Sequence, residues 1–177
     1  MKKLSMEELD RLSVSQFREI DKIPVVVVLD NIRSQHNIGS VFRTADAFRI
    51  ESIHLCGITA TPPNREIQKT ALGATESVNW KYYSTTMESL IELKKQGYSI
   101  IAIEQADESK PINDFKPQIF NKMALVFGNE VYGVQDEVMS ICDDCIEIPQ
   151  YGTKHSLNVS VSAGIVIWDV YNKCTGK

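Results

Sequence analysis

The sequence predicts an α/β fold with a mostly parallel sheet flanked by helices, and three observations support this prediction. The 177 residues are enough for one domain with a hydrophobic core. Apolar residues make up 43% of the chain and charged residues 24%, close to the averages of globular proteins. Short apolar runs alternate with segments of helical spacing, as in βαβ units. The pattern indicates one domain, residues 23–177, preceded by an N-terminal helical extension, residues 1–22.

The first elements are a helix in the extension, a buried strand and a second helix. Ser5 and Glu8 have the spacing of a capping box, and a helical stripe follows at residues 9, 12, 16, 17 and 20. After Pro24, residues 25–29 form a continuous run of Val and Leu, typical of a strand that is buried on both faces. From Ile38 onward the apolar residues return to helical spacing.

The rest of the chain continues this alternation. Further strands are predicted at residues 53–56, 78–83, 100–103, 123–127 and 145–148. Helices are predicted at residues 65–71 and 134–142, and another runs from the capping box of Thr85 and Glu88 to Gly97. Residues 157–171 fit both periods, and because strands rarely run so long we expect a helix. Its wide apolar surface predicts burial against the sheet or against another subunit.

Composition and cysteine usage restrict the class of protein. No segment has the apolar length of a bilayer span or the pattern of a signal peptide, so we expect a cytoplasmic protein without a membrane partner. The four cysteines are too few for a disulfide scaffold. Cys142 and Cys145 form a lone CxxC pair, which is half of a zinc site, a redox pair or two reduced cysteines. The neighbouring Asp143 and Asp144 should raise the thiol pKa, so we favour reduced cysteines and expect no metal.

Three polar clusters lie where a predicted strand ends and the next segment begins. They span residues 31–45, 128–133 and 148–158. Ligands bind outside the carboxyl ends of strands in open α/β sheets, so the shared placement points to one site. The second cluster has the glycine spacing of a phosphate-binding loop without its lysine, and no GxGxxG occurs. A purely structural interpretation stays open for a solvated Arg43, a turn or cap residue Glu130, and a helix cap at Ser156 or Asn158.

The three clusters resemble the motifs of the SpoU (TrmH) family of RNA 2′-O-ribose methyltransferases, within the SPOUT superfamily. The first is similar to N-x-G-x-x-x-R-T-A, here Asn37, Gly39, Arg43, Thr44 and Ala45. The second is similar to F-G-x-E-x-x-G, here Phe127, Gly128, Glu130 and Gly133. The third is similar to P-x-x-G-x-x-x-S-L-N-V-S-x-A, which begins at Pro149 and has one extra residue before Ala163. Three motifs in the expected order, spread over residues 37–163, make the resemblance specific.

The resemblance implies a fold, a cofactor and an assembly. The implied fold is the SPOUT fold, a parallel α/β fold whose C-terminal part forms a trefoil knot. The implied cofactor is S-adenosyl-L-methionine, and the positions implied to bind it are Val126, Gly128, Asn129, Ile148, Ser156 and Leu157. The implied assembly is a homodimer with the C-terminal helix in its interface.

The resemblance also implies a site for methyl transfer to a ribose 2′-hydroxyl. Attack of the hydroxyl on the methyl group requires positioning and stabilisation of the developing negative charge. The implied catalytic residues are Arg43, Asn37, Glu130, Ser156 and Asn158. Because a guanidinium has a pKa above about 12, we interpret Arg43 as orienting the RNA and stabilising the oxyanion rather than as the base. The implied RNA-binding residues are Arg33, Arg43 and Lys154.

The distribution of charge decides how the acidic total is interpreted. A net charge of −4 by itself argues against a nucleic-acid partner. Residues 1–70, however, carry a net charge of +1, and residues 84–147 carry −7. We therefore expect tRNA or rRNA to bind the arginine-bearing first part of the chain. Three alternatives stay open: a SPOUT-fold RNA-binding protein without catalysis, an unrelated α/β enzyme for a nucleotide or metabolite, and a dimeric scaffold whose clusters are caps.

Overall fold

The sheet is parallel throughout, as the sequence predicts. The computed structural model describes residues 1–5, 7–117 and 121–176. Within these residues the strand order is β3-β2-β1-β6-β4-β7-β5, and every neighbouring pair is parallel. The strands are β1 (Ile23–Asp30), β2 (Ile50–Cys56), β3 (Asn79–Tyr83), β4 (Ser99–Ile103), β5 (Lys110–Pro111), β6 (Met123–Phe127) and β7 (Asp144–Glu147).

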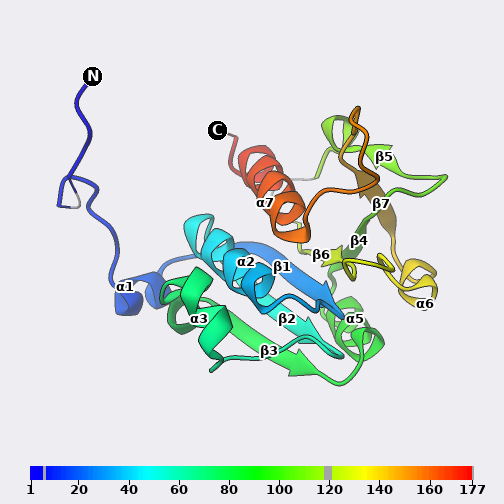
Figure 1. Cartoon of the computed structure of the whole chain (residues 1–177), viewed down its shortest axis with the longest axis horizontal. Helices are drawn as coiled ribbons and strands as arrows, with labels where there is room; N and C mark the ends of the chain where they lie inside the picture. Colours follow the sequence, from blue (N-terminus) through cyan, green and yellow to red (C-terminus); the bar gives the residue numbers. More distant parts are fainter. Residues whose placement is uncertain (6, 118–120, 177) are drawn as a thin grey trace.

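Helices cover both faces of the sheet (Figure 1). They are α1 (Val14–Glu19), α2 (Gln35–Ala47), α3 (Arg65–Ala71), α4 (Ala74–Ser77), α5 (Thr86–Lys95), α6 (Asp136–Met139) and α7 (Val159–Thr175), with a short 3-10 helix at Ile112–Asp114. The helices α2, α3 and α7 contribute to the hydrophobic core on one face, whereas α5 and α6 contribute to the core on the other. The α/β architecture flanked by helices is therefore confirmed.

The strand β1 lies inside the sheet, between β2 and β6, and is buried on both faces, which explains its unbroken apolar sequence. Val25, Val27 and Leu29 join the core beneath α2 and α7. Val26 and Val28 alternate with them and join the core beneath α5. Full burial of one such side chain contributes roughly 1.5–3 kcal/mol to the free energy of folding. This strand is therefore a stable base for the first polar cluster, which follows it directly.

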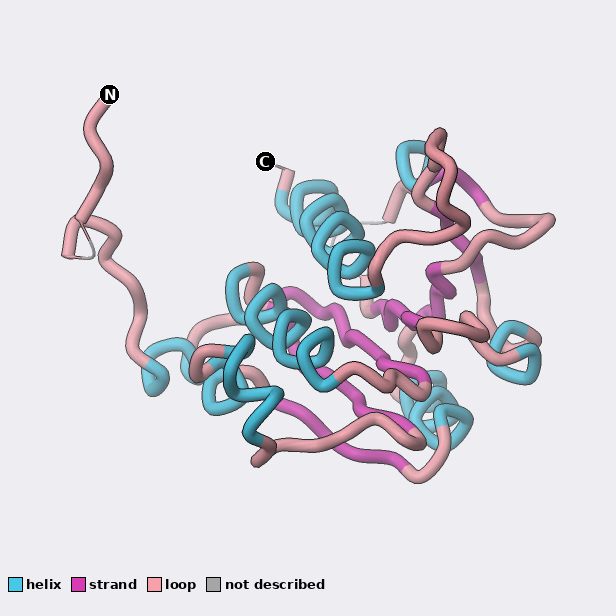
Figure 2. Tube along the Cα trace, viewed as in Figure 1, coloured by secondary structure: helices cyan, strands magenta, loops and turns pink. Residues whose placement is uncertain are grey.

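The N-terminal extension forms less helix than the sequence predicts. Ser5 and Glu8 make the reciprocal contacts of a capping box, with Glu8 Oε2 accepting from the Ser5 N–H at 2.7 Å, but only a turn follows. The helix itself is α1, whose own capping box joins Ser13 and Gln16. The reason is that the apolar stripe has little to pack against. Phe17 is the buried residue of α1, the described residues before it are exposed, and they extend away from the sheet (Figure 2).

A further expectation is wrong in extent. The helix predicted at residues 134–142 is reduced to α6, because carboxylates hold the chain out of helical geometry before Asp136. The Val134 N–H donates to Glu104 Oε2 at 3.0 Å, and the Gln135 N–H donates to Asp30 Oδ2 at 3.1 Å. The short elements α4, β5 and the 3-10 helix have no clear sequence pattern. The segment that fits both periods is a helix, α7, which ends at Thr175 with Gly176 as its cap.

Candidate functional site

The three polar clusters lie at the carboxyl ends of β1, β6 and β7, as the sequence predicts. The strands β1 and β6 are neighbours in the sheet, and β4 separates β6 from β7. Each cluster therefore begins with a loop at the same edge of the sheet. Hydrogen bonds between side chains then join these loops to one another.

Glu130 connects the second cluster to the first. Its carboxylate accepts hydrogen bonds from the backbone N–H groups of Arg33 and Ser34, both at 3.0 Å, directly before α2. Burial alone would raise the pKa of the Glu130 carboxyl, but these backbone hydrogen bonds outweigh it and the pKa is lowered. A carboxylate at the N-terminus of a helix also interacts favourably with the helix dipole. Glu130 thus holds the chain directly before α2, whose N-cap is Ser34, and it does not cap the helix that follows it in sequence.

Asn37 extends this connection to the third cluster. Its side-chain amide donates to Glu130 Oε1 at 3.2 Å, and its carbonyl oxygen accepts from Asn158 Nδ2 at 3.1 Å. Asn158 is also the N-cap of α7, since its Oδ1 accepts the backbone N–H of Ser160 at 2.9 Å. The capping interpretation of Asn158 is confirmed, and the same residue takes part in the site. Asn37, Glu130 and Asn158 therefore form one hydrogen-bonded chain across all three clusters.

The turn after β6 is rigid and depends on two glycines. The backbones of Asn129 and Gly133 exchange two hydrogen bonds of 2.9 Å, and Gly133 has a φ of +68°. A Cβ on Gly128 would lie 2.1 Å from the backbone of Val134, so a larger residue would not fit there. The Asn129 amide donates to the carbonyl of Asn31 at 2.6 Å, which fixes the turn against the first cluster.

A cavity of about 740 Å³, here named the first cavity, opens between the loops after β4, β6 and β7. Of the positions that the resemblance assigns to a cofactor, Gly128, Asn129, Ile148, Ser156 and Leu157 line it. Val126 does not, because it is fully buried in the core beneath α5. The carboxylates that line it belong to Glu104, Glu130, Asp136 and Glu147. No lysine or arginine is among its described lining residues.

Glu104 and Gln105 are among the lining residues that the sequence interpretation missed. Glu104 and Gln105 follow β4 directly, and Glu104 Oε2 accepts from the Val134 N–H at 3.0 Å. The Gln105 amide donates to the carbonyl of His155 at 2.9 Å, so this pair holds the loops on both sides of the cavity. The available signal was their position after an apolar strand, the same signal that identifies the three clusters.

Arg43 lies apart from the first cavity. It is exposed on α2, away from the core stripe, as predicted, and it lines a second cavity of about 560 Å³. The charged residues lining this second cavity with Arg43 are Asp10, Arg11, Asp46, Arg49 and Glu76. Arg33 and Lys154, the other two predicted RNA-binding residues, are exposed on the loops before α2 and after β7. One copy of the chain thus groups Asn37, Glu130 and Asn158, places Ser156 in the first cavity, and leaves Arg43 in the second.

The cysteines and histidines are dispersed. All four cysteines are free, and burial is the main cause that raises the pKa of Cys142 to about 11 and raises the pKa of Cys145. The neighbouring aspartates add to that effect, as the sequence predicts. Across the described part of the chain, no group of three or more His, Cys, Asp or Glu side chains is arranged to hold a metal ion. The described helices also include none that is long and apolar enough to cross a membrane.

The fold and the site define a parallel α/β protein with a ligand cavity built from polar loops at the carboxyl edge of its sheet. The model of the SpoU rRNA Methylase family matches residues 24–168, and the chain belongs to this family. The predicted family is thereby confirmed.

Individual relatives agree with this assignment. The chain is 35% identical over 144 residues to the 23S rRNA (guanosine-2'-O-)-methyltransferase RlmB of Neisseria meningitidis serogroup B, a match that covers 81% of this chain and 56% of that relative. The chain therefore spans little more than half the length of this relative.

Solved structures show the same fold. The A. aeolicus TrmH/SpoU tRNA modifying enzyme is 26% identical, with a TM-score of 0.81 over 92% of this chain and 83% of that one. The AdoMet-bound rRNA methyltransferase of Sinorhizobium meliloti is 25% identical, with a TM-score of 0.79 over 89% of this chain and 59% of that one.

Proposed function

We propose that this protein is an S-adenosyl-L-methionine-dependent RNA methyltransferase that transfers a methyl group to a ribose 2′-hydroxyl of tRNA or rRNA. One observation carries the proposal: Glu130, Asn37 and Asn158 join the three family motifs beside the first cavity. Membership of the SpoU family and the names of the relatives support it.

The first cavity fits the proposed cofactor in size and in charge. Its volume is within the usual range of small-molecule sites, and Ile103, Ile148 and Leu157 offer apolar surface to an adenine ring. Its carboxylates, without a lysine or arginine in the described lining, favour a ligand with a sulfonium and an ammonium group. When bound, S-adenosyl-L-methionine supplies the electrophilic methyl group. The same carboxylates repel the phosphates of RNA, so only the reacting ribose needs to approach the cavity.

The residues around the cavity supply positioning more than acid–base chemistry. Asn37 is held from both sides by Glu130 and Asn158, so its amide is fixed where the ribose arrives. Arg43 is six residues further along α2, about 9 Å along the helix axis. We assign Arg43 to the RNA phosphate and to the developing oxyanion, because a guanidinium is a cation that offers several N–H donors and no acceptor.

We propose a homodimer formed through α7. Val161, Ile165 and Trp168 form an apolar stripe along it, and Leu157 lies directly before its N-cap; their exposed fractions are between 37% and 55%. The steps of four and three residues place the stripe on one helix face. Because Leu157 also lines the first cavity, a second copy docked on the stripe lies beside the cavity mouth and can bring its own α2 there. This arrangement accounts for the separation of Arg43 from the first cavity within one copy.

Family membership supports two further parts of the proposal. We infer that the C-terminal part of the chain threads the trefoil knot of the SPOUT fold, in keeping with the insertion of β6 between β1 and β4. We also place the protein in the cytoplasm, a reducing compartment, where its four free cysteines would stay reduced.

Transfer of a radiolabelled methyl group to RNA tests the function. The substrate is total RNA from a strain in which the gene for this protein is deleted, and S-adenosyl-L-methionine is the methyl donor. The modified nucleotide is mapped afterwards. Labelled 2′-O-methyl nucleosides in tRNA or rRNA are the expected result. RNA binding without transfer would instead identify a catalytically silent relative, and cofactor binding with neither RNA binding nor transfer would leave an unrelated enzyme.

A further inference from the structure

Tyr132 is a large aromatic side chain that the fold holds in solvent. It is 84% exposed, yet it belongs to the rigid turn closed by Asn129 and Gly133. Its backbone N–H donates to Asn129 Oδ1 at 3.2 Å, beside a second bond of 2.9 Å from the Val131 N–H to the same oxygen. The turn therefore fixes the point from which the ring projects, while the ring itself stays free to meet a ligand.

The position of this ring relates it to the proposed reaction. Tyr132 lines the first cavity, two residues after Glu130. Glu130 binds the backbone of Arg33 and Ser34 and the side chain of Asn37. Because Tyr132 belongs to the same turn as Glu130, these hydrogen bonds also connect the turn of Tyr132 to Asn37. The aromatic ring thus stands beside the place where the ribose must arrive.

We propose that Tyr132 stacks on a nucleobase of the RNA substrate, either the base of the methylated nucleotide or its immediate neighbour. The proposal rests on the proposed function and adds the surface that holds the substrate. Proteins recognise unpaired RNA bases chiefly by stacking them on aromatic side chains, a contact that tolerates any base. Arg33 is exposed, and its backbone N–H binds Glu130 of the same turn. We expect its guanidinium to supply a cation for a phosphate of the bound RNA.

A nucleobase fits this surface better than a second copy of the chain does. The apolar stripe suited to self-association is on α7, a different element, whereas Tyr132 stands on a short turn with exposed Val131 and the polar residues Asn129 and Glu130. An aromatic ring at a cavity whose carboxylates repel phosphate matches a base with its phosphate directed outward. Asn37, which binds Glu130 of the same turn, is then available to the sugar of that nucleotide.

Steady-state methylation with the full chain tests the proposal, using the same undermethylated total RNA as substrate. Tyr132→Ala should raise the KM for RNA by about tenfold, within the range that the loss of one base stack produces, and should change kcat less. Tyr132→Phe and Tyr132→Trp should keep the KM within about twofold of the parent, because the ring is what stacks. The control is Ile91→Ala, which removes an exposed apolar side chain on α5 and should leave the KM unchanged.

Two companion measurements separate the possible failures. Calorimetry should give the same Kd for S-adenosyl-L-methionine in the parent and in Tyr132→Ala, and sedimentation should give the same oligomeric state. A parental KM in Tyr132→Ala, a weakened cofactor Kd that accounts for its loss of activity, or a dissociated assembly would each overturn stacking. If the parent itself transfers no methyl group, the proposed function fails first and the stacking role fails with it.

Discussion

Replacing Glu130 with glutamine tests whether the connection between the first two motifs holds the site together. The carboxylate accepts two backbone N–H groups and the Asn37 amide, using both of its oxygens. Glutamine offers one acceptor oxygen, and its NH₂ group would face a backbone N–H without bonding to it. The substitution also removes the negative charge from the N-terminus of α2.

The magnitude follows from these losses. A hydrogen bond to a charged group contributes about 1.5–3 kcal/mol, and water can replace part of it at this exposed position. We therefore expect the free energy of unfolding to fall by about 1–2 kcal/mol in Glu130→Gln. For a chain of this size that lowers the Tm by about 3–6 °C, measured by thermal denaturation at one fixed protein concentration. Methyl transfer should fall as well, because Asn37 loses its fixed position.

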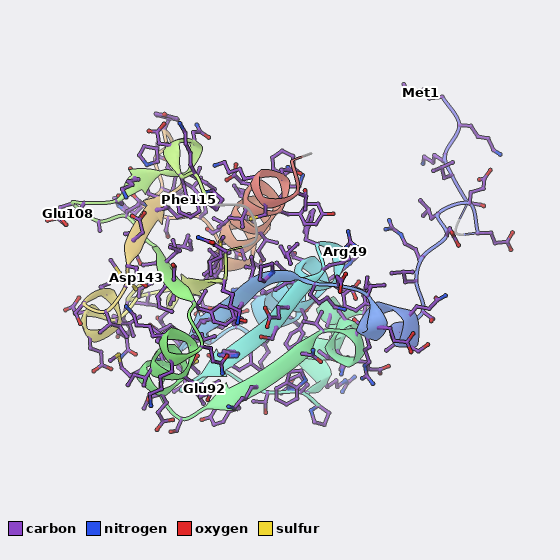
Figure 3. The ribbon with its side chains drawn as sticks, turned by 180° about the vertical axis from the view of Figure 1, so that it is seen from behind. Met1, Arg49, Glu92, Glu108, Phe115 and Asp143 are labelled. Carbon is purple, nitrogen blue, oxygen red and sulfur yellow. The ribbon has the colours of Figure 1, made fainter. Side chains whose placement is uncertain are left out.

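The pH dependence has a defined sign. The pKa of the Glu130 carboxyl is lowered in the folded protein from an ordinary value of 4.5, so its stabilising effect is complete above that value. The effect is lost as the pH falls through the folded pKa, so parent and variant should converge in acid. Glu108→Gln is the matched control, since Glu108 projects from the periphery (Figure 3). If Glu130→Gln melts at the parental temperature at neutral pH, the contacts of Glu130 do not stabilise the site and the reasoning is refuted.

Three other substitutions test the remaining parts of the site. Arg43→Ala should abolish methyl transfer and change the free energy of unfolding by less than about 0.5 kcal/mol, because the side chain is exposed on α2; a parental rate in the radiolabel assay would contradict this. Leu157→Asp should raise the Kd of S-adenosyl-L-methionine about tenfold, since it removes an apolar wall of the first cavity, and unchanged calorimetry would refute that placement. Arg43→Ala and Asn37→Ala chains, co-expressed so that mixed dimers form, should regain about a quarter of the parental activity if two copies share each site. About half of the dimers are then mixed, and one of the two sites in each mixed dimer is intact. Mixed dimers without activity would assign both residues to one copy.

The sequence predicted most of the sheet because its strands are short apolar runs with clear ends. It also predicted that the three polar clusters share one edge, since parallel strands present their carboxyl ends together. It did not predict which clusters touch. Glu130 and the Arg33 backbone are 97 residues apart in the chain, and they meet only because β6 lies beside β1. Strand order of this kind leaves no trace in local hydrophobic spacing.

The sequence could not show that residues of one motif face different parts of the molecule. Arg43 and Asn37 belong to one motif and one helix, and the pattern treats them as parts of one site. A helix turns by about 100° per residue, so six residues place the two side chains on clearly different faces. The structure accordingly directs Asn37 to Glu130 and Asn158, which line the first cavity, and Arg43 to the second cavity. The prediction of a longer helix in the N-terminal extension was wrong for a related reason. The spacing of apolar residues cannot show whether the rest of the fold offers a surface for them to pack against.

The positions of the charged residues explain the net negative charge of the chain. The acidic lining of the first cavity, at the ends of β4, β6 and β7, attracts a cationic cofactor and repels RNA phosphates. Arg33 lies in the loop before α2 and Arg43 in the middle of α2, and neither lines the first cavity. In the proposed reaction these arginines guide a polyanion, whereas the carboxylates guide a cation. The two reactants of the proposed transfer then meet where the fold fixes a polar side chain, and the net charge of −4 reflects the cofactor half of the site.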